Sequence, residues 1–80
     1  MLKEKIKIDN DLDFIYIKNK LKSTFHNFSF NEIDGLKIEN NSSWVHVRKS
    51  NTEPIIRIYI ESKSKQDSKE LFTAVKKALR

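Results

Sequence analysis

A polar loop of seven residues, Arg48 to Pro54, separates the two most strand-like segments of this chain, residues 44–47 and 55–60. The second segment is dense in β-branched side chains, which are typical of buried strands. Because side chains alternate along a strand, its isoleucines at 56, 58 and 60 share one face, while Arg57 and Tyr59 share the other. We therefore interpret the rest of the chain as a scaffold built around a sheet that carries this loop.

The length limits the fold to one domain over residues 1–80, with a core that leaves roughly 3 to 5 kcal/mol of net stability. Hydrophobic residues make up 38% of the chain and charged residues 34%, which allows a compact core but no membrane span. There is no cysteine, and the first residues lack the apolar run of a signal peptide, so we expect a cytoplasmic protein. The net charge of +5 favours anionic partners, although a lysine-rich solubilising surface explains it as well.

The first third of the chain predicts one extended segment and one helix. Residues 1–10 include alternating charged and apolar side chains, which fit an edge strand or an ordered linker. Residues 11–25 predict a helix, whose apolar positions recur at steps of three and four. That buried stripe would consist of Phe14, Ile17, Leu21 and Phe25. A strand is the alternative near its start, because Leu12, Phe14 and Tyr16 also alternate.

The middle of the chain predicts short strands. Residues 28–30 alternate as a strand does, and Gly35 after Asp34 indicates a turn with a positive φ angle. Residues 36–39 and 44–47 predict a hairpin through the turn formers at 40–43. One face of this hairpin would be apolar, and Trp44 and His46 would lie on the other. We interpret His46 as a surface strand residue, because local spacing places no catalytic partner beside it.

The end of the chain predicts a second helix. Ser64 and Asp67 resemble an N-terminal cap, and a basic end follows. Its core-facing positions would be Leu71, Phe72, Val75, Ala78 and Leu79. The order of elements predicts an α+β fold, a two-layer sandwich of an antiparallel sheet with about four strands and two helices on one face.

The polar loop concentrates the donors that an anion needs. Arg48 offers a bidentate guanidinium, and Ser50, Asn51 and Thr52 offer hydroxyl, amide and backbone N–H groups. A phosphate monoester requires several such donors within a small volume. Arg57 either pairs with a carboxylate such as Glu61 or lies toward the loop. On these grounds alone, a polar turn without a ligand is an equal alternative.

The loop Arg48-Lys49-Ser50-Asn51-Thr52-Glu53-Pro54, together with the flanking strands and the upstream Asp34-Gly35, resembles the C-terminal domain of the α-D-phosphohexomutases. The resemblance covers residues 33–80 well and the first third of the chain loosely. It is strongest toward the phosphomannomutase/phosphoglucomutase branch, because Asn51 stands where other branches carry glycine.

The resemblance implies a fold like half of the TATA-box-binding protein and a loop that grips the phosphate that is not transferred. By motif position, Arg48, Ser50, Asn51 and Thr52 are the phosphate contacts, with Lys49 and Arg57 as secondary candidates. The implied ligand is a mannose or glucose phosphate, within the interconversion of hexose 1-phosphate and hexose 6-phosphate. The implied partners are the remaining domains of the same mutase. Those domains would supply the phosphoserine and Mg²⁺, so this domain would hold no cofactor and would not catalyse the reaction alone.

Two other classes of function compete with this one, a nucleic-acid-binding module and a purely structural module. Nucleic acid would suit the basic excess together with Trp44, His46 and Tyr59, but the chain lacks an aromatic-rich RNA-binding signature and a continuous basic stripe.

Three alternating aspartates could suggest a metal site, namely Asp9, Asp11 and Asp13. A helix cap explains them better than a metal site.

Overall fold

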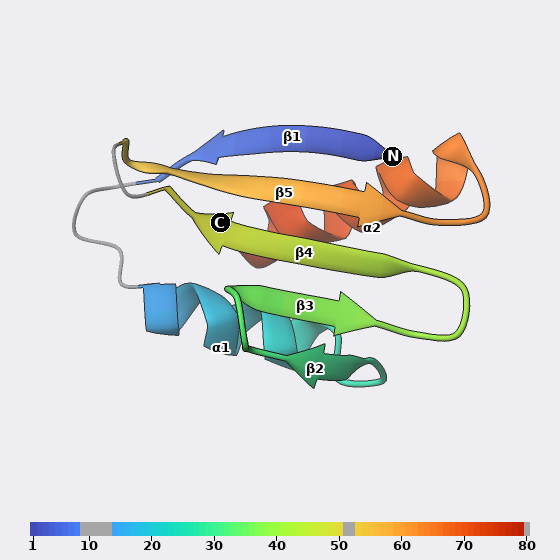
Figure 1. Cartoon of the computed structure of the whole chain (residues 1–80), viewed down its shortest axis with the longest axis horizontal. Helices are drawn as coiled ribbons and strands as arrows, with labels where there is room; N and C mark the ends of the chain where they lie inside the picture. Colours follow the sequence, from blue (N-terminus) through green and yellow to red (C-terminus); the bar gives the residue numbers. More distant parts are fainter. Residues whose placement is uncertain (9–13, 51–52, 80) are drawn as a thin grey trace.

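A computed structural model describes residues 1–8, 14–50 and 53–79 of the chain. The elements are β1 (Leu2–Lys7), α1 (Phe14–Thr24), β2 (Ser29–Asn31), β3 (Leu36–Glu39), β4 (Trp44–Lys49), β5 (Ile55–Glu61) and α2 (Lys65–Ala78). All five strands form one antiparallel sheet in the order β1-β5-β4-β3-β2. Both helices cover the same face of this sheet (Figure 1). The predicted α+β sandwich is therefore confirmed.

The first segment is an edge strand rather than a linker. It pairs with β5 along its whole length, from Leu2 opposite Ile60 to Lys7 opposite Ile55. This pairing makes a sheet of five strands where the sequence predicted about four. The alternation explains the strand, because its apolar side chains pack against the core while its lysines stay exposed. Exposed lysines on an edge strand also discourage pairing with another chain.

The core lies between the inner face of the sheet and the two helices. The sheet contributes seven fully buried side chains, namely Leu36, Ile38, Val45, Val47, Ile56, Ile58 and Ile60. From α1, Ile17 and Leu21 are buried, Phe25 just beyond its end is buried too, and Phe14 is half-buried. The predicted helical stripe is thus confirmed, and the strand alternative at Phe14 and Tyr16 is wrong. Residues 11–13 of the predicted helix lie outside the described ranges.

Helix α2 begins at the cap that the sequence predicted. The Asp67 N–H donates to the Ser64 side-chain oxygen at 3.1 Å, which satisfies one of the free donors of the first turn. Val75 is completely buried. The other predicted core positions, Leu71, Phe72, Ala78 and Leu79, are half-buried against the same core. Its apolar face therefore belongs to the core of the domain.

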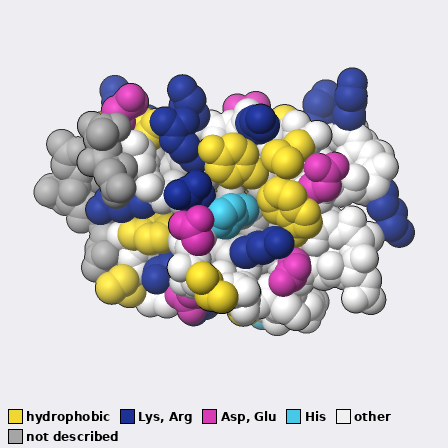
Figure 2. Space-filling view, viewed as in Figure 1, with side chains coloured by type: hydrophobic (Ala, Val, Ile, Leu, Met, Phe, Trp, Pro, Cys, Tyr) yellow, Lys and Arg dark blue, Asp and Glu magenta, His cyan; other side chains and the backbone are white. Residues whose placement is uncertain are grey.

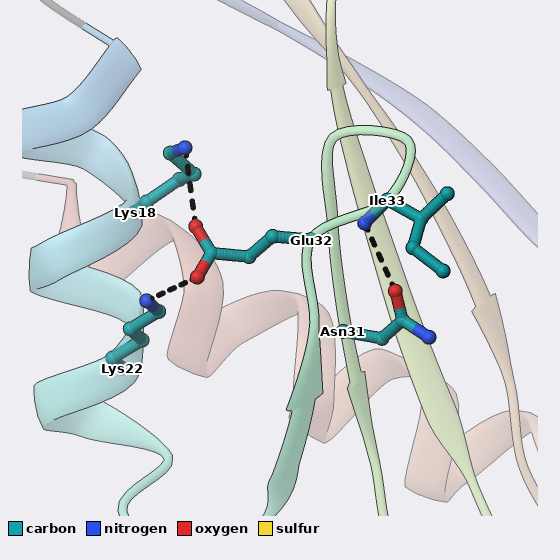
Figure 3. A network of polar contacts seen from close by, with 5 residues as sticks. All are labelled: Lys18, Lys22, Asn31, Glu32 and Ile33. Atoms are coloured by element: carbon teal, nitrogen blue, oxygen red, sulfur yellow. Dashed lines mark hydrogen bonds and ion pairs between the residues drawn. The ribbon is translucent and has the colours of Figure 1, made fainter.

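The connection between β2 and β3 is braced against α1. Lys18 and Lys22 on α1 contact the two carboxylate oxygens of Glu32 at 3.1 and 2.6 Å (Figure 3). Beside them, the Asn31 side chain accepts a hydrogen bond from the Ile33 N–H at 2.9 Å (Figure 3). The two lysines lie on one side of the helix because they are four residues apart. The turn thus has a fixed path on its helix side.

Gly35 ends this connection with a φ angle of +73°, as the sequence predicted. An added Cβ would lie 2.4 Å from the Val47 carbonyl oxygen, so the turn runs directly against the backbone of β4. Only glycine meets both demands, a left-handed backbone and this close approach. The next turn, at 40–43, is closed by Asn40, whose side chain accepts the N–H groups of Ser42 and Ser43.

Candidate anion-binding site

Backbone hydrogen bonds close the base of the loop between β4 and β5. The Ser50 N–H donates to the Ile55 carbonyl at 3.1 Å, and the Ile55 N–H donates to the Glu53 carbonyl at 2.8 Å. The Ile8 N–H donates to the Pro54 carbonyl at 2.8 Å, which ties the loop to the end of β1. The loop is therefore held by strands on both sides. Asn51 and Thr52 lie outside the described residues, so their proposed roles stay predictions.

Arg48 stands at the base of this loop, near the end of β4. Its side chain is 51% exposed, and its Nε lies 3.5 Å from Oδ1 of Asp34. A contact through Nε occupies one of the five guanidinium N–H groups, which leaves the pair of Nη groups to meet an anion. Of the neighbouring predicted site residues, Lys49 is exposed and Ser50 is half-buried.

Arg57 lies directly across the sheet from Arg48, and on its other side it faces Lys5. The predicted pairing with Glu61 is wrong, since four residues of extended strand separate the two by about 13 Å. Glu61 instead contacts the Met1 amino group at 3.9 Å. The alternative, that Arg57 lies toward the loop, stays a prediction, because the register fixes its opposite neighbours and not the direction of its side chain. Three cations thus stand in a row across β1, β5 and β4, and like charges directly opposite one another are destabilising.

The face of the sheet opposite the helices carries this row of cations, and Figure 2 views that face. Trp44, His46 and Tyr59 are half-buried there, as the alternation predicted, and the rings of His46 and Tyr59 lie 6.3 Å apart. A shallow hollow of about 440 Å³ opens beside them. Its lining residues are Lys3, Glu4, Lys5, Arg57 and Tyr59. Basic and aromatic side chains therefore share this accessible face of the sheet.

The sequence reasoning missed Asp34 as a neighbour of Arg48. The predicted hairpin contained a signal for this contact. Leu36 pairs with Val47 in the structure, and one further residue along each strand places Gly35, the neighbour of Asp34, beside Arg48. The interpretation of His46 as a surface strand residue was also incomplete. His46 is a half-buried strand residue, and its Nε2 donates to the Asp34 carbonyl oxygen, which can only accept.

No group of three histidine, cysteine or acidic side chains suited to a metal ion occurs within residues 1–8, 14–50 and 53–79. The described residues thus contain no ligand cluster of this kind for Mg²⁺. The aspartates at 9, 11 and 13 lie outside those ranges. In the same described ranges, neither helix has the length and apolar character that crossing a membrane requires.

Fold and loop together define a class of small two-layer α+β domains with a cation-bordered hairpin loop at one end of the sheet. A model of the phosphoglucomutase/phosphomannomutase C-terminal domain family matches residues 3–78. The chain belongs to this family. The match spans all seven elements from β1 to α2, so it extends well beyond the loop motif.

Curated relatives carry the names of several mutases. A probable phosphoglucosamine mutase of Pyrococcus furiosus is 39% identical over 73 residues, which covers 88% of this chain and 16% of the relative. A phosphomannomutase of Methanocaldococcus jannaschii is 34% identical over 61 residues, covering 76% and 14%. A phosphoglucomutase/phosphomannomutase of Thermococcus kodakarensis is 37% identical over 68 residues, covering 85% and 15%. The chain thus spans about a sixth of the length of these relatives.

Proposed function

We propose that this chain is the substrate-phosphate-binding domain of a hexose phosphate mutase, and that its loop grips the phosphate that is not transferred. Arg48, Ser50, Asn51 and Thr52 are the proposed contacts, with Lys49 and Arg57 in secondary roles. The remaining domains of the mutase would supply the reacting groups and Mg²⁺. The domain would then contribute binding energy and orientation to the reaction.

One observation carries this proposal beyond family membership. Arg48 and Arg57 face each other across the two strands that lead into and out of the loop. Their mutual repulsion is relieved when an anion binds between or beside them, and a phosphate carries nearly two negative charges. Arg48 adds the fork geometry that matches two phosphate oxygens. The closed base of the loop holds both strands in place while the ligand binds.

The sugar belongs to the proposal as well. We propose a mannose or glucose phosphate, because the family resemblance places Asn51 where other branches of the family carry glycine. Relatives named as phosphoglucosamine mutases and as phosphomannomutases both match this chain, so a direct comparison of ligands decides the branch.

The test is an NMR titration of the ¹⁵N-labelled chain with glucose 6-phosphate, mannose 1-phosphate and glucosamine 6-phosphate, with glucose as the control for the phosphate. We expect amide shifts centred on Ser50 to Thr52 with the phosphorylated sugars and none with glucose. Arg48→Ala should abolish them. Lys69→Ala, which removes an equal charge from an exposed position on helix α2, should preserve them. Loop amides that stay unmoved at millimolar ligand, or that move equally in Arg48→Ala, contradict the proposal.

A single-stranded oligonucleotide at low salt tests the nucleic-acid alternative on the same sample. The open face of the sheet, which is the face opposite the helices, carries aromatic and basic side chains. Such side chains bind single-stranded nucleic acid by stacking on the bases and by charge. Shifts spread over Trp44 and Tyr59 with a steep salt dependence would favour that alternative, while shifts confined to the loop favour the phosphate site.

A further inference from the structure

Asp34 lies beside the guanidinium that we assign to the phosphate, although an acidic group there would be expected to repel an anion. Its Oδ1 is 3.5 Å from Nε of Arg48. The side chains of both residues are well exposed, at 64% and 51%, so burial does not force the pair together. An exposed pair of this kind generally adds little stability. The contact therefore needs an explanation other than stability.

The turn that carries Asp34 is held on two sides. Toward β4, the Asp34 carbonyl accepts from His46, and Gly35 runs against the Val47 carbonyl. Toward α1, the preceding Glu32 is fixed by Lys18 and Lys22, as Figure 3 shows. The carboxylate of Asp34 consequently projects from a braced backbone, and a braced group is suited to orient a neighbour.

The atom that Asp34 contacts determines how Arg48 is oriented. Arginine has a long side chain, and fixing it in one conformation costs rotamer entropy. A carboxylate at Nε holds one edge of the guanidinium plane and leaves the Nη edge free to bind two oxygens of an anion. A carboxylate across both Nη groups would instead occupy the edge that the phosphate needs.

We propose that Asp34 is a positioning residue of the phosphate site, which holds Arg48 by Nε so that its Nη edge is presented to the ligand. This inference rests on the proposed function of the loop. Asp34 itself does not contact the phosphate. Removal of Asp34 should therefore weaken anion binding. Simple electrostatics predicts the opposite, namely tighter anion binding, because the net charge rises by one unit.

The experiment compares wild-type chain, Asp34→Asn, Asp34→Ala and Glu39→Gln. Glu39 lies on the same open face of the sheet, on β3, and its substitution changes the net charge by the same unit without touching Arg48. Each variant is titrated with inorganic phosphate and with glucose 6-phosphate. We expect both Asp34 variants to lose about two- to fivefold in affinity, with the smaller loss in Asp34→Asn because its side-chain oxygen can still lie next to Nε of Arg48. Glu39→Gln should bind as tightly as the wild type or slightly more tightly.

A second measurement reads the position of Arg48 directly. The rate at which the Arg48 Nε–H exchanges with water is measured by ¹⁵N NMR without ligand. This rate should rise severalfold in both Asp34 variants and remain unchanged in Glu39→Gln. Should Asp34→Ala prove too unstable, Asp34→Asn keeps the size and shape of the side chain.

The outcomes separate the two proposals. Asp34 variants that bind phosphate as well as or better than the wild type overturn the positioning role, while loss of binding in Arg48→Ala would still support the phosphate site. Unchanged exchange of the Arg48 Nε–H also overturns it, whether or not phosphate binds. Wild-type loop amides that do not respond to phosphate overturn the function of the site itself.

Discussion

Arg48 and Arg57 occupy directly opposite positions on β4 and β5, so the two strands that flank the loop each contribute a guanidinium to the same face of the sheet. Cross-strand neighbours lie about 5 Å apart at their Cβ atoms, and two cations at this separation weaken the pair of strands. The arrangement trades some stability for positive charge beside the loop, and this trade can be measured.

Arg57→Gln should therefore affect binding and stability differently. The free energy of unfolding should stay within about 0.5 kcal/mol of the wild type or rise, because a like-charge contact on both sides of Arg57 is removed. Affinity for glucose 6-phosphate should fall by up to about tenfold, the loss of one charge-assisted hydrogen bond. Urea unfolding and the NMR titration measure the two effects. An unaltered affinity would remove Arg57 from the site.

Gly35→Ala should destabilise the domain strongly. A side chain in the left-handed region costs about 1 to 2 kcal/mol, and the new Cβ would also meet the Val47 carbonyl at 2.4 Å. Urea unfolding should show a loss of at least that size. Asn41→Ala, in the exposed turn between β3 and β4, is the matched control and should change stability by less than about 0.5 kcal/mol. Equal losses in both variants would contradict the close packing of Gly35 on β4.

Ile58→Val should reveal how tightly the sheet packs on the helices. Ile58 lies on β5 and is completely buried, so loss of one methylene should cost about 0.5 to 1.5 kcal/mol of unfolding free energy. Ile33→Val removes the same group from a side chain that is 91% exposed, and its cost should be near zero. A domain of this size has a small margin of stability, so the difference should be clear in the urea midpoint.

Acid should abolish the contribution of the Glu32 carboxylate to the stability of the folded domain. The hydrogen bond from Lys22, and next the one from Lys18, lower the pKa of Glu32 in the folded protein below its ordinary value. The ionised carboxylate thus favours folding, so its contribution is complete above the unfolded pKa of about 4.3 and is lost as the pH falls through the folded pKa. Glu32→Gln should be less stable than the wild type at pH 7 and equally stable near pH 2.

Two further variants test the cause of that shift. Lys22→Ala should raise the pKa of Glu32 toward its ordinary value in a carboxyl NMR titration, because it removes the leading interaction. Lys20→Ala removes a lysine of the same helix that is not among the partners of Glu32, and it should leave the pKa of Glu32 as low as in the wild type. A Glu32 pKa that is the same in Lys22→Ala as in the wild type would contradict the pairing in Figure 3.

The sequence predicts most of the fold because local patterns determine it. Ile56, Ile58 and Ile60 recur with the period of a strand, and Leu71 and Val75 with that of a helix, so each element shows which face it buries. The spacing of turn formers then predicts the hairpin of β3 and β4. These patterns depend only on neighbours along the chain, and the structure agrees with them.

Contacts between distant segments were harder to predict. Residues 1–10 fitted two interpretations because alternation alone does not reveal a partner strand, and β5 is that partner. For Arg57, the sequence allows a pairing with Glu61, a residue that is near in sequence but remote along an extended strand. Asp34 reaches Arg48 only after the hairpin folds in register. The residues around the loop could thus be named from the motif, while their mutual geometry required the sheet.

The pairing of β1 with β5 has a consequence for synthesis of the chain. β1 is synthesised well before β5, the strand beside which it lies, and β5 also completes the pairing of β4. On the ribosome, β1 therefore remains without its neighbour until residues 55–61 have emerged, and closing such a long-range contact is slow. The base of the loop, which depends on both β1 and β5, is consequently among the last parts of the domain to form.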